Sequence, residues 1–400
     1  MQCERLDEIQ RALADEGLDA WLFCDFRGSD PIARRILGLG DELATRRWFY
    51  AIAARGKARG LVSAVEPAAL GELPGQMHVY RTWQELHAGL RALLAGVRRI
   101  AMQYSPNNDV PYVARVDAGT IELVRGCGVE VVSSADLVQA FEAVWTAEQY
   151  ASHTRAAAGV RATVDAAFAE IARRAREQRA CGEGDMQRYI LDQFAARGLV
   201  THHSPIVAVG PHSADPHYQP PPRGGAPIGA GDFVLIDLWA KEPDGVYADI
   251  TWTGYVGDAV PARHAQIFDV VRRARDAGVD AARRAVRAHT PLRGCEVDAV
   301  VRRVIAEAGF ADRFVHRTGH SIGTEVHGNG ANIDGFETPD TRRLLRGTCF
   351  SIEPGIYLPG EFGVRSELNV FVDDSDIVVT GEPVQSAVVA LLGAAPRTDS

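Results

Sequence analysis

Four acids and one histidine are the residues of this chain whose types and spacing best suit chemistry. They are Asp237, Asp249, His320, Glu353 and Glu367. Carboxylate oxygens and an imidazole nitrogen, with no cysteine among them, suit a pair of hard or borderline divalent cations. Two such cations can activate a water molecule for hydrolysis. The five residues therefore predict a dinuclear metal centre with hydrolytic chemistry.

The spacing of the first acidic pair predicts that both carboxylates lie on one face of a β-hairpin. Asp237 and Asp249 are 12 positions apart, with Pro243 at the midpoint. Asp244-Gly245 provides the turn signal. We expect the two acids to lie directly opposite each other, which would place their Cβ atoms about 4.5–5.5 Å apart. That distance suits carboxylates that share two cations about 3.5–4 Å apart.

The second acidic pair repeats this geometry. Glu353 and Glu367 are 14 positions apart, around Gly360. Apolar runs precede both Asp237 and Glu353, so both read as residues of interior strands. A single acid on a strand is more often solvated, but an interior carboxylate needs a partner. Two such pairs favour the metal site over solvated acids.

His320 stands between two glycines. A lone histidine is more often structural than functional, and that alternative applies here too. Gly319 and Gly323, however, leave room for a close approach of backbone or ligand. The loop therefore predicts a histidine ligand beside the two acidic hairpins.

Length and composition indicate a folded two-domain protein. The chain has 400 residues, of which 46% are hydrophobic and 24% charged. Its net charge is −9 with dispersed arginines, which weighs against a nucleic-acid partner. Six cysteines without a C-x-x-C pair predict free thiols. We see neither a signal peptide nor an apolar run of about 18 residues, so we expect a cytoplasmic protein without a membrane partner.

Residues 1–144 alternate helix-like and strand-like segments, which predicts a three-layer α/β domain. No G-x-G-x-x-G or P-loop follows its strands, so no catalytic group is expected there. The apolar segment Trp48–Tyr50 is interpreted as a core strand, with a role in limiting access to a partner subunit's site as the alternative. The predicted helices are 6–13 and 83–97, and the predicted strands are 20–24, 48–52, 60–65, 99–102 and 129–132.

Residues 145–400 follow a different order. Thr146 and Gln149 fit a capping box at the start of a long helix. Helices precede antiparallel strands twice, which predicts an α+β domain of two similar halves. The predicted helices are 147–180, 184–197, 262–287 and 296–308, and the predicted strands are 206–210, 232–241, 246–257, 348–358, 363–373 and 376–380.

On these five positions the chain resembles the pita-bread metallopeptidases, which comprise Xaa-Pro dipeptidases (prolidases), aminopeptidase P, methionine aminopeptidase and the metal-free creatinases. The resemblance covers residues ~145–385, and residues 1–144 look like the creatinase-type N-terminal domain. Creatinases lack the ligand set, so the match implies a metal-dependent member. Methionine aminopeptidases usually lack the large N-terminal domain, which favours the proline-specific branch.

The resemblance also implies roles for the ligands. Asp249 and Glu367 would bridge two metals, Asp237 would hold one of them, and His320 with Glu353 would hold the other. A hydroxide between the metals would attack the scissile carbonyl, with Glu353 as the proton shuttle. The ligand set accepts Mn²⁺, Co²⁺, Zn²⁺ and Fe²⁺, so the availability of each metal decides which one binds. For activity, the family resemblance favours Mn²⁺ or Co²⁺.

Three further residues match substrate-side positions of the family. His217 matches a histidine on the substrate side, and His327 matches a second one near the scissile carbonyl or its oxyanion. Arg365 matches an arginine that contacts substrate or orients a ligand. The remaining histidines of this region have no such match and are interpreted as surface or more distant residues: His202, His203 and His212.

Three positions depart from the family pattern. Trp252 stands where an arginine usually follows Asp-Ile-Thr, so a charge near the metals is expected to be missing. The segment Leu238–Lys241 replaces a glycine and an aromatic residue, in a hairpin one residue longer than in many relatives. Ser321 stands where glycine is usual. These departures predict altered surroundings of the metal ligands with the ligands themselves intact.

The predicted function is hydrolysis of Xaa-Pro dipeptides at the imide bond, with two divalent ions, Mn²⁺ before Co²⁺ or Zn²⁺, in a homodimer. The first alternative is aminopeptidase P, which acts on longer Xaa-Pro peptides. The second is another small-molecule hydrolase or lyase, or a binding protein without enzymatic activity, on the same fold.

Overall fold

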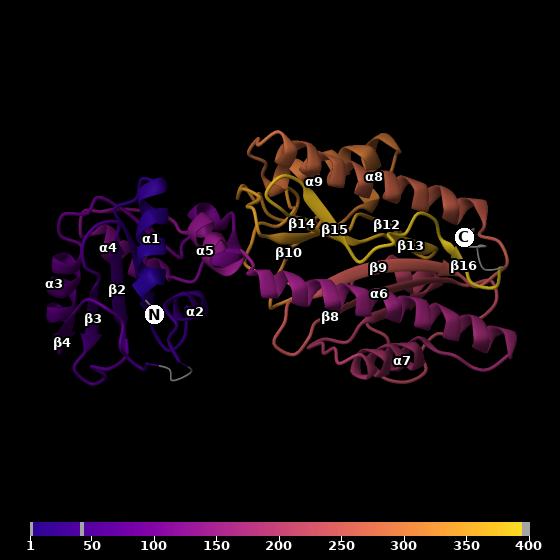
Figure 1. Ribbon diagram of the computed structural model, residues 1–400, viewed down its shortest axis with the longest axis horizontal. Coiled ribbons are helices and arrows are strands. Elements are labelled where there is room, and N and C mark those ends of the chain that lie inside the picture. The colour runs from indigo at the N-terminus through magenta and orange to yellow at the C-terminus, as the bar shows by residue number, and fades with distance from the viewer. Residues whose placement is uncertain (1–2, 41–43, 394–400) are drawn as a thin grey trace. The chain divides into compact units, whose positions relative to one another are not determined.

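The computed structural model describes residues 3–40 and 44–393. The chain divides into two compact units after Glu142 (Figure 1). In the described residues, no helix is both long enough and apolar enough to cross a lipid bilayer. The thiols of Cys24, Cys127, Cys181, Cys295 and Cys349 are free, as predicted.

The first unit is built on one mixed sheet with the strand order β4-β3-β2-β1-β5-β6. Its strands are β1 (Ala20–Asp25), β2 (Trp48–Ala53), β3 (Arg59–Ser63), β4 (Gln76–Tyr80), β5 (Arg99–Met102) and β6 (Glu130–Ser133). Its helices are α1 (Cys3–Asp15), α2 (Pro31–Leu37), α3 (Trp83–Leu93), α4 (Ala118–Arg125) and α5 (Ala135–Glu142), with 3-10 turns at Pro106–Asn108 and Pro111–Val113. β1 pairs with β2 antiparallel and with β5 parallel.

Alternating residues of this sheet build two separate cores. Trp21 and Trp48 pack on one face with residues of α1 and α2, whereas Leu22 and Phe49 pack on the other face with residues of α3 and α4. Successive side chains of a strand point to opposite faces, so a run of apolar residues can serve both cores. The three-layer arrangement is confirmed, and Trp48–Tyr50 is a core strand with every side chain at most 1% exposed.

The second unit contains two four-stranded sheets, β16-β9-β8-β7 and β10-β11-β14-β15, and the two-stranded sheet β12-β13, with helices packed against them (Figure 1). Helices α6 (Ala147–Arg176) and α7 (Glu183–Ala196) share a core with the sheet β16-β9-β8-β7. Helices α8 (Ala262–Arg287) and α9 (Gly294–Glu307) pack against the later strands. The strands are β7 (Ile206–Val209), β8 (Phe233–Ala240), β9 (Ala248–Tyr255), β10 (Ser321–Ile322), β11 (Cys349–Ile352), β12 (Gly355–Leu358), β13 (Phe362–Arg365), β14 (Leu368–Val372), β15 (Ile377–Thr380) and β16 (Val389–Ala390), with 3-10 turns at Gly210–Ala214 and Ala311–Arg313.

The long helix α6 begins as predicted and ends early. Thr146 N donates to Gln149 Oε1 at 2.8 Å, and Gln149 N donates to Thr146 Oγ1 at 3.2 Å. This reciprocal pair is the predicted capping box. The helix ends at Arg176 rather than Ala180.

The predicted strands 348–358 and 363–373 are wrong as continuous strands. Each is interrupted, the first at Glu353-Pro354 and the second at Ser366-Glu367. Pro354 has no backbone N–H to donate to a ladder. Glu353 N donates instead to Thr318 O at 2.8 Å, and Glu367 N donates to Thr251 O at 3.3 Å. The interruptions thus free both glutamates from the ladder and turn their backbones toward other segments.

His153 joins α6 to two other parts of the second unit. Its side chain is fully buried, with Nδ1 2.7 Å from Tyr247 O and Nε2 2.7 Å from Thr380 Oγ1. Because a carbonyl only accepts, Nδ1 carries the proton and Nε2 accepts from the threonine hydroxyl. Burial lowers the pKa of His153 to about 4.

The buried His153 is expected to make the second unit less stable in mild acid. The unfolded state binds this proton near pH 6.5 and the folded state only near pH 4, so the unfolding free energy falls as the pH drops through that window. The loss amounts to about 3 kcal/mol across the window. Urea unfolding of the wild type and of His153→Gln between pH 7.5 and 5 should show a shallower pH dependence in the variant. His289→Gln, at an exposed position, is the control and should retain the wild-type slope.

Candidate metal centre

Asp237 on β8 and Asp249 on β9 lie on the same face of one hairpin, but they are not directly opposite. Asp237 pairs with Thr251, and Asp249 pairs with Trp239. The paired residues are centred on Asp244, so the predicted midpoint at Pro243 is wrong by one residue. Lys241 lies beyond the end of the ladder and pairs with Val200. The resulting offset of two residues along the strand is even, so both carboxylates still point to the same side.

Glu353 and Glu367 lie between the β11–β14 ladder and the β12–β13 ladder, whose residue pairs follow the same register. Gly355 pairs with Arg365 on one side of the gap, and Ile352 pairs with Leu368 on the other. Both pairs are centred on Gly360, so the predicted midpoint is confirmed. The two glutamates come opposite each other where the ladder is open, and neither side chain lies within a regular strand.

The histidine loop reaches the acids through a close backbone contact. A Cβ atom on Gly319 would lie 1.9 Å from Ser351 O, so only glycine allows this approach. His320 N donates to Ser351 Oγ at 3.0 Å, which ties the loop to β11. His320 Nε2 lies 3.5 Å from Asp249 Oδ2 and 3.4 Å from Glu353 Oε1.

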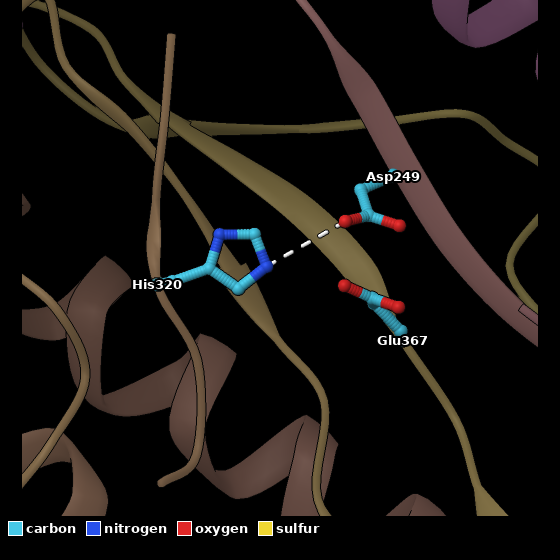
Figure 2. A group of neighbouring side chains, drawn as sticks. All are labelled: Asp249, His320 and Glu367. Carbon is cyan, nitrogen blue, oxygen red and sulfur yellow. Dashed lines mark ion pairs between the residues drawn. The ribbon is translucent and has the colours of Figure 1, made fainter. Parts of the chain in front are cut away.

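Asp249, His320 and Glu367 form the centre of the cluster. Figure 2 shows their side chains directed toward one another from three separate segments. Each offers a ligand atom within 4.8 Å of the others, and all three residues are buried. Asn369 on β14 holds the Asp249 backbone from both sides, since its Oδ1 accepts from Asp249 N at 3.0 Å and its Nδ2 donates to Asp249 O at 2.7 Å.

Burial makes this cluster costly without a cation. Burial and then the neighbouring charge of Asp237 raise the pKa of Asp249 well above its usual range. Burial and the charge of Asp249 do the same to the pKa of Glu367, and burial raises the pKa of Glu353. Burial also lowers the pKa of His320, which keeps its imidazole neutral and able to act as a ligand.

Two carboxylate oxygens of the cluster lack partners. Asp249 Oδ1 and Glu367 Oε1 are buried, and neither accepts a hydrogen bond from any residue that the structure describes. Buried acceptors are nearly always satisfied, so unsatisfied ones indicate a missing partner. Oxygen donors beside a neutral imidazole fit one or more divalent cations.

Thr251 and Arg365 orient the carboxylates. Thr251 Oγ1 donates to Glu367 Oε2 at 2.8 Å and lies 3.2 Å from Asp237 Oδ1. Arg365 Nε donates to Thr251 Oγ1 at 3.0 Å, and its Nη2 donates to Asp237 Oδ2. Its Nη1 donates to Tyr357 Oη at 3.1 Å. The buried guanidinium thus places a positive charge beside the acids and fixes their rotamers.

The cluster forms part of the wall of a cavity of about 720 Å³. All five predicted ligands line it, together with His217, His327 and Arg365. The His327 ring centre lies 4.3 Å from that of His320. Repulsion between the two imidazoles in their protonated forms, and then burial, lower the pKa of His327 to about 2. The structure therefore brings every predicted site residue to one cavity.

Three further histidines line the same cavity. His202 and His203, predicted to lie at the surface or farther from the site, line the cavity, because the chain before β7 turns back past Tyr247. His316 also lines it and was missed, although it lies four residues before His320 in the same loop. His316 Nε2 is 2.7 Å from Tyr357 Oη and Nδ1 is 2.7 Å from Arg317 O. Burial and the charge of Arg365 lower the pKa of His316 to about 3.

Trp252 does not take part in the surroundings of the metal ligands. Asp249 and Thr251 face the cluster, so Trp252 faces the opposite side of β9, where it lies in the core shared with α6. Arg161 Cζ stacks 3.8 Å from its ring centre. The expectation that Trp252 removes a charge from the metal site is therefore wrong.

The other two departures are accommodated locally. Trp239 lines the cavity and Leu238 lies in the core, while Lys241 Nζ donates to Thr324 O at 2.7 Å and links the hairpin to the histidine loop. Ser321 Oγ accepts from Gly330 N at 3.0 Å. A Cβ on Gly330 would lie 2.5 Å from that hydroxyl, so glycine there makes room for the serine.

Glu183, at the start of α7, organises the loop that carries His217. Its buried carboxylate accepts from four donors: Val209 N, Ala226 N, His212 Nδ1 and Tyr218 Oη, at 2.9, 3.0, 2.8 and 2.6 Å. These donors span both ends and the middle of residues 209–226. The loop is thus held by one side chain at its base.

Replacing Thr251 by valine should weaken metal binding without unfolding the protein. The change conserves shape but removes the hydroxyl between Glu367, Asp237 and Arg365. Loss of a group that orients ligands typically reduces metal affinity about 10- to 100-fold. Titration against a competing chelator measures this loss. Thr253→Val, also buried on β9 but hydrogen-bonded to Gln385, is the control, and equal affinity in both variants would contradict the proposed orienting role.

Replacing Glu183 by glutamine should loosen residues 210–226. The NH₂ group of glutamine cannot accept a hydrogen bond, so at least one donor that bonds to Glu183 in the wild type would lose its acceptor. This loss should lower the free energy of unfolding by about 1–3 kcal/mol. We expect a lower urea midpoint and faster amide hydrogen exchange in this loop. Asp192→Asn, which removes an exposed charge from the same helix, should change neither measurement. Unchanged exchange in Glu183→Gln would show that the loop is held by other contacts.

The model of the family described as metallopeptidase family M24 matches residues 151–374. The probable dipeptidase PepE of Mycobacterium tuberculosis is 37% identical over 208 residues, which are 52% of this chain and 52% of that protein. The Xaa-Pro dipeptidase of Lactobacillus delbrueckii subsp. lactis is 36% identical over 169 residues, which are 42% of each. The chain thus spans about half the length of the curated relatives it matches.

A solved structure extends the likeness over almost the whole fold. The crystal structure of dipeptidase PepE from Mycobacterium ulcerans matches with a TM-score of 0.70 at 26% identity, covering 97% of both chains. The fold class and the family resemblance predicted from the sequence are confirmed. The family model covers more than half of the chain, and the protein belongs to metallopeptidase family M24.

Proposed function

We propose that the protein hydrolyses Xaa-Pro dipeptides at the bond before proline, with two divalent cations, preferably Mn²⁺, at the cluster around Asp249. The observation that carries the proposal is the pair of unsatisfied buried oxygens, Asp249 Oδ1 and Glu367 Oε1, beside a cavity of about 720 Å³ in a member of a metallopeptidase family. One matched relative is named Xaa-Pro dipeptidase, which supports the choice of substrate.

The five predicted ligands would divide between two cations. Asp249 and Glu367 would bridge them, since each has one oxygen that no other described residue uses. Asp237 would complete one site, and His320 with Glu353 the other, in line with the 3.4 Å separation of these two side chains. The cations, when bound, would supply Lewis acidity and lower the pKa of a water molecule.

Glu353 is proposed to move the proton. Ser351 Oγ donates to Glu353 Oε1 at 3.0 Å, and Arg365 Nε lies 3.9 Å from Oε2. Oε1 is thus held by the serine hydroxyl, which leaves Oε2 as the atom that accepts a proton from the attacking water and returns it to the proline nitrogen.

His217 and His327 are proposed to bind the substrate from the cavity wall. His327, which packs against His320, would donate a hydrogen bond to the oxygen of the scissile carbonyl as charge develops there. Arg365 is committed to Asp237, Thr251 and Tyr357, which supports orientation of a ligand over contact with the substrate. Cytoplasmic location and a homodimer stay predictions.

Purified full-length protein with Mn²⁺ should hydrolyse Ala-Pro and Leu-Pro, and Asp249→Ala should abolish turnover. The variant removes a bridging ligand and should also lower the bound metal measured by elemental analysis. Asp244→Asn, in the same hairpin but exposed, should keep both properties. Parallel assays with Co²⁺, Zn²⁺ and Fe²⁺ identify the most active metal.

Comparison of Ala-Pro with Ala-Pro-Ala separates the two proline-specific activities. Preference for the dipeptide supports the proposal, and preference for the tripeptide favours an aminopeptidase P activity. Metal-replete protein that cleaves no Xaa-Pro peptide of either length would refute the proposed function. Protein that also binds no metal would indicate a binding protein on this fold.

A further inference from the structure

The first unit contains a second cavity, of about 660 Å³, that the proposed peptidase chemistry does not use. It lies where β1 ends and β2 begins, beside α3 and the first turn of α4. Its lining includes two acids, two arginines and three apolar residues: Asp25, Asp117, Arg47, Arg115, Phe26, Val116 and Leu123.

The topology of the sheet places this cavity where α/β folds characteristically bind ligands. β1 lies between β2 and β5 in the sheet, and β5 runs parallel to it. The strand that follows β1 in the chain, β2, is thus its neighbour on one side, and the later strand β5 is its neighbour on the other. The helix after β1, α2, packs on one face of the sheet, whereas the helix after β5, α4, packs on the opposite face. A crevice opens at the carboxyl end of strands whose connections diverge in this way.

Both acids in the cavity already accept hydrogen bonds from neighbouring residues of their own segments. Both oxygens of Asp25 accept from their own loop: Oδ2 from Gly28 N at 3.0 Å, and Oδ1 from Asp30 N at 2.9 Å and Ser29 Oγ at 3.2 Å. Both oxygens of Asp117 accept from Thr120, at 2.9 and 2.6 Å. These carboxylates therefore shape the loop and cap the helix.

The arginines in the cavity retain their donors. Across residues 3–40 and 44–393, neither Arg47 nor Arg115 forms a side-chain hydrogen bond or ion pair. Each guanidinium offers five N–H donors in a plane, a geometry that matches a carboxylate or a phosphate. The two arginines are therefore the charged groups of the cavity whose side chains have no partner among the described residues.

An apolar wall accompanies the two arginines. Phe26 is 47% exposed at the end of β1, which is unusual for a large aromatic side chain. Val116 and Leu123 are partly buried in the core below the cavity. Apolar walls with a few convergent polar groups are typical of small-molecule sites.

We infer that this crevice is a binding site for a small anion, which carries a carboxylate or phosphate group on an apolar body. Arg47 and Arg115 would hold the anionic group, and Phe26, Val116 and Leu123 would contact the apolar part. The site shares no residue with the cavity at the metal cluster, and every residue that lines it belongs to the first unit.

Calorimetric titration of the full-length, metal-loaded protein tests the site with defined probes. Benzoate and phenyl phosphate supply the two anionic groups on one ring, benzamide is the neutral match, and inorganic phosphate lacks the ring. Each probe is titrated into wild type, Arg115→Gln, Arg47→Gln/Arg115→Gln and the control Arg55→Gln, an exposed arginine outside the cavity. Asp249→Ala reports any binding at the metal cluster.

We expect one site for benzoate, phenyl phosphate or both, with benzamide at least about tenfold weaker. Loss of one charge-assisted contact at Arg115 should weaken binding about tenfold or more, and the double variant should weaken it further. Arg55→Gln and Asp249→Ala should bind as wild type does. The probe that binds more tightly identifies the carboxylate or the phosphate as the preferred group.

Several results would overturn the inference. They are the absence of binding by both ring anions, unchanged affinity in the double arginine variant, and loss of binding in Asp249→Ala alone. Inorganic phosphate that binds as tightly as phenyl phosphate would refute the apolar half of the site. Arg115 is exposed, so its single variant remains informative even if the double variant unfolds. No outcome depends on peptide turnover, so failure here is distinct from failure of the proposed peptidase activity.

Discussion

The burial of several carboxyl groups around His320 is the constraint on which the second unit depends. Each ionised carboxylate in a buried site loses hydration that a neighbouring carboxylate cannot replace. Arg365 supplies one compensating charge, and Thr251 shares its hydroxyl between two of the acids. Asp249 and Glu367 each keep one oxygen without a partner, so the protein alone leaves the compensation incomplete. A divalent cation would complete it, and binding of that cation would then link the chemistry of the site to the stability of the fold.

The same constraint explains why the sheet is interrupted at the cluster. A regular ladder would use the backbone groups of Glu353 and Glu367 to pair those two strands with each other. Instead Glu353 N bonds to the histidine loop and Glu367 N bonds to β9. Each glutamate thereby joins its strand to another element that carries a ligand. The segments that carry Asp249, His320, Glu353 and Glu367 are joined where the ladder is open, and Asn369 adds the link between β14 and Asp249.

Much of the site could be predicted because side-chain direction in a strand depends only on whether a spacing is even. That rule placed Asp237 and Asp249 on one face even though their register was wrong. The register itself depends on where the ladder ends, and the last pair, Ala240 with Ala248, is not marked by the local sequence. The short helices α2, α4 and α5 were missed because seven or eight residues carry little periodicity. The edge strand β4 was missed because three of its five residues are exposed, so it shows no apolar run.

Trp252 shows where resemblance alone misleads and geometry corrects it. A missing arginine next to Asp249 and Thr251 in sequence suggests a missing charge next to them in space. On a pleated strand, however, the adjacent residue points to the other face, where Trp252 packs beneath α6 and receives the guanidinium of Arg161 at 3.8 Å. Strand β9 thus has one face for chemistry and one for packing. A change on the packing face can affect the cluster only by shifting the backbone, and the Asn369 clamp on Asp249 opposes such a shift.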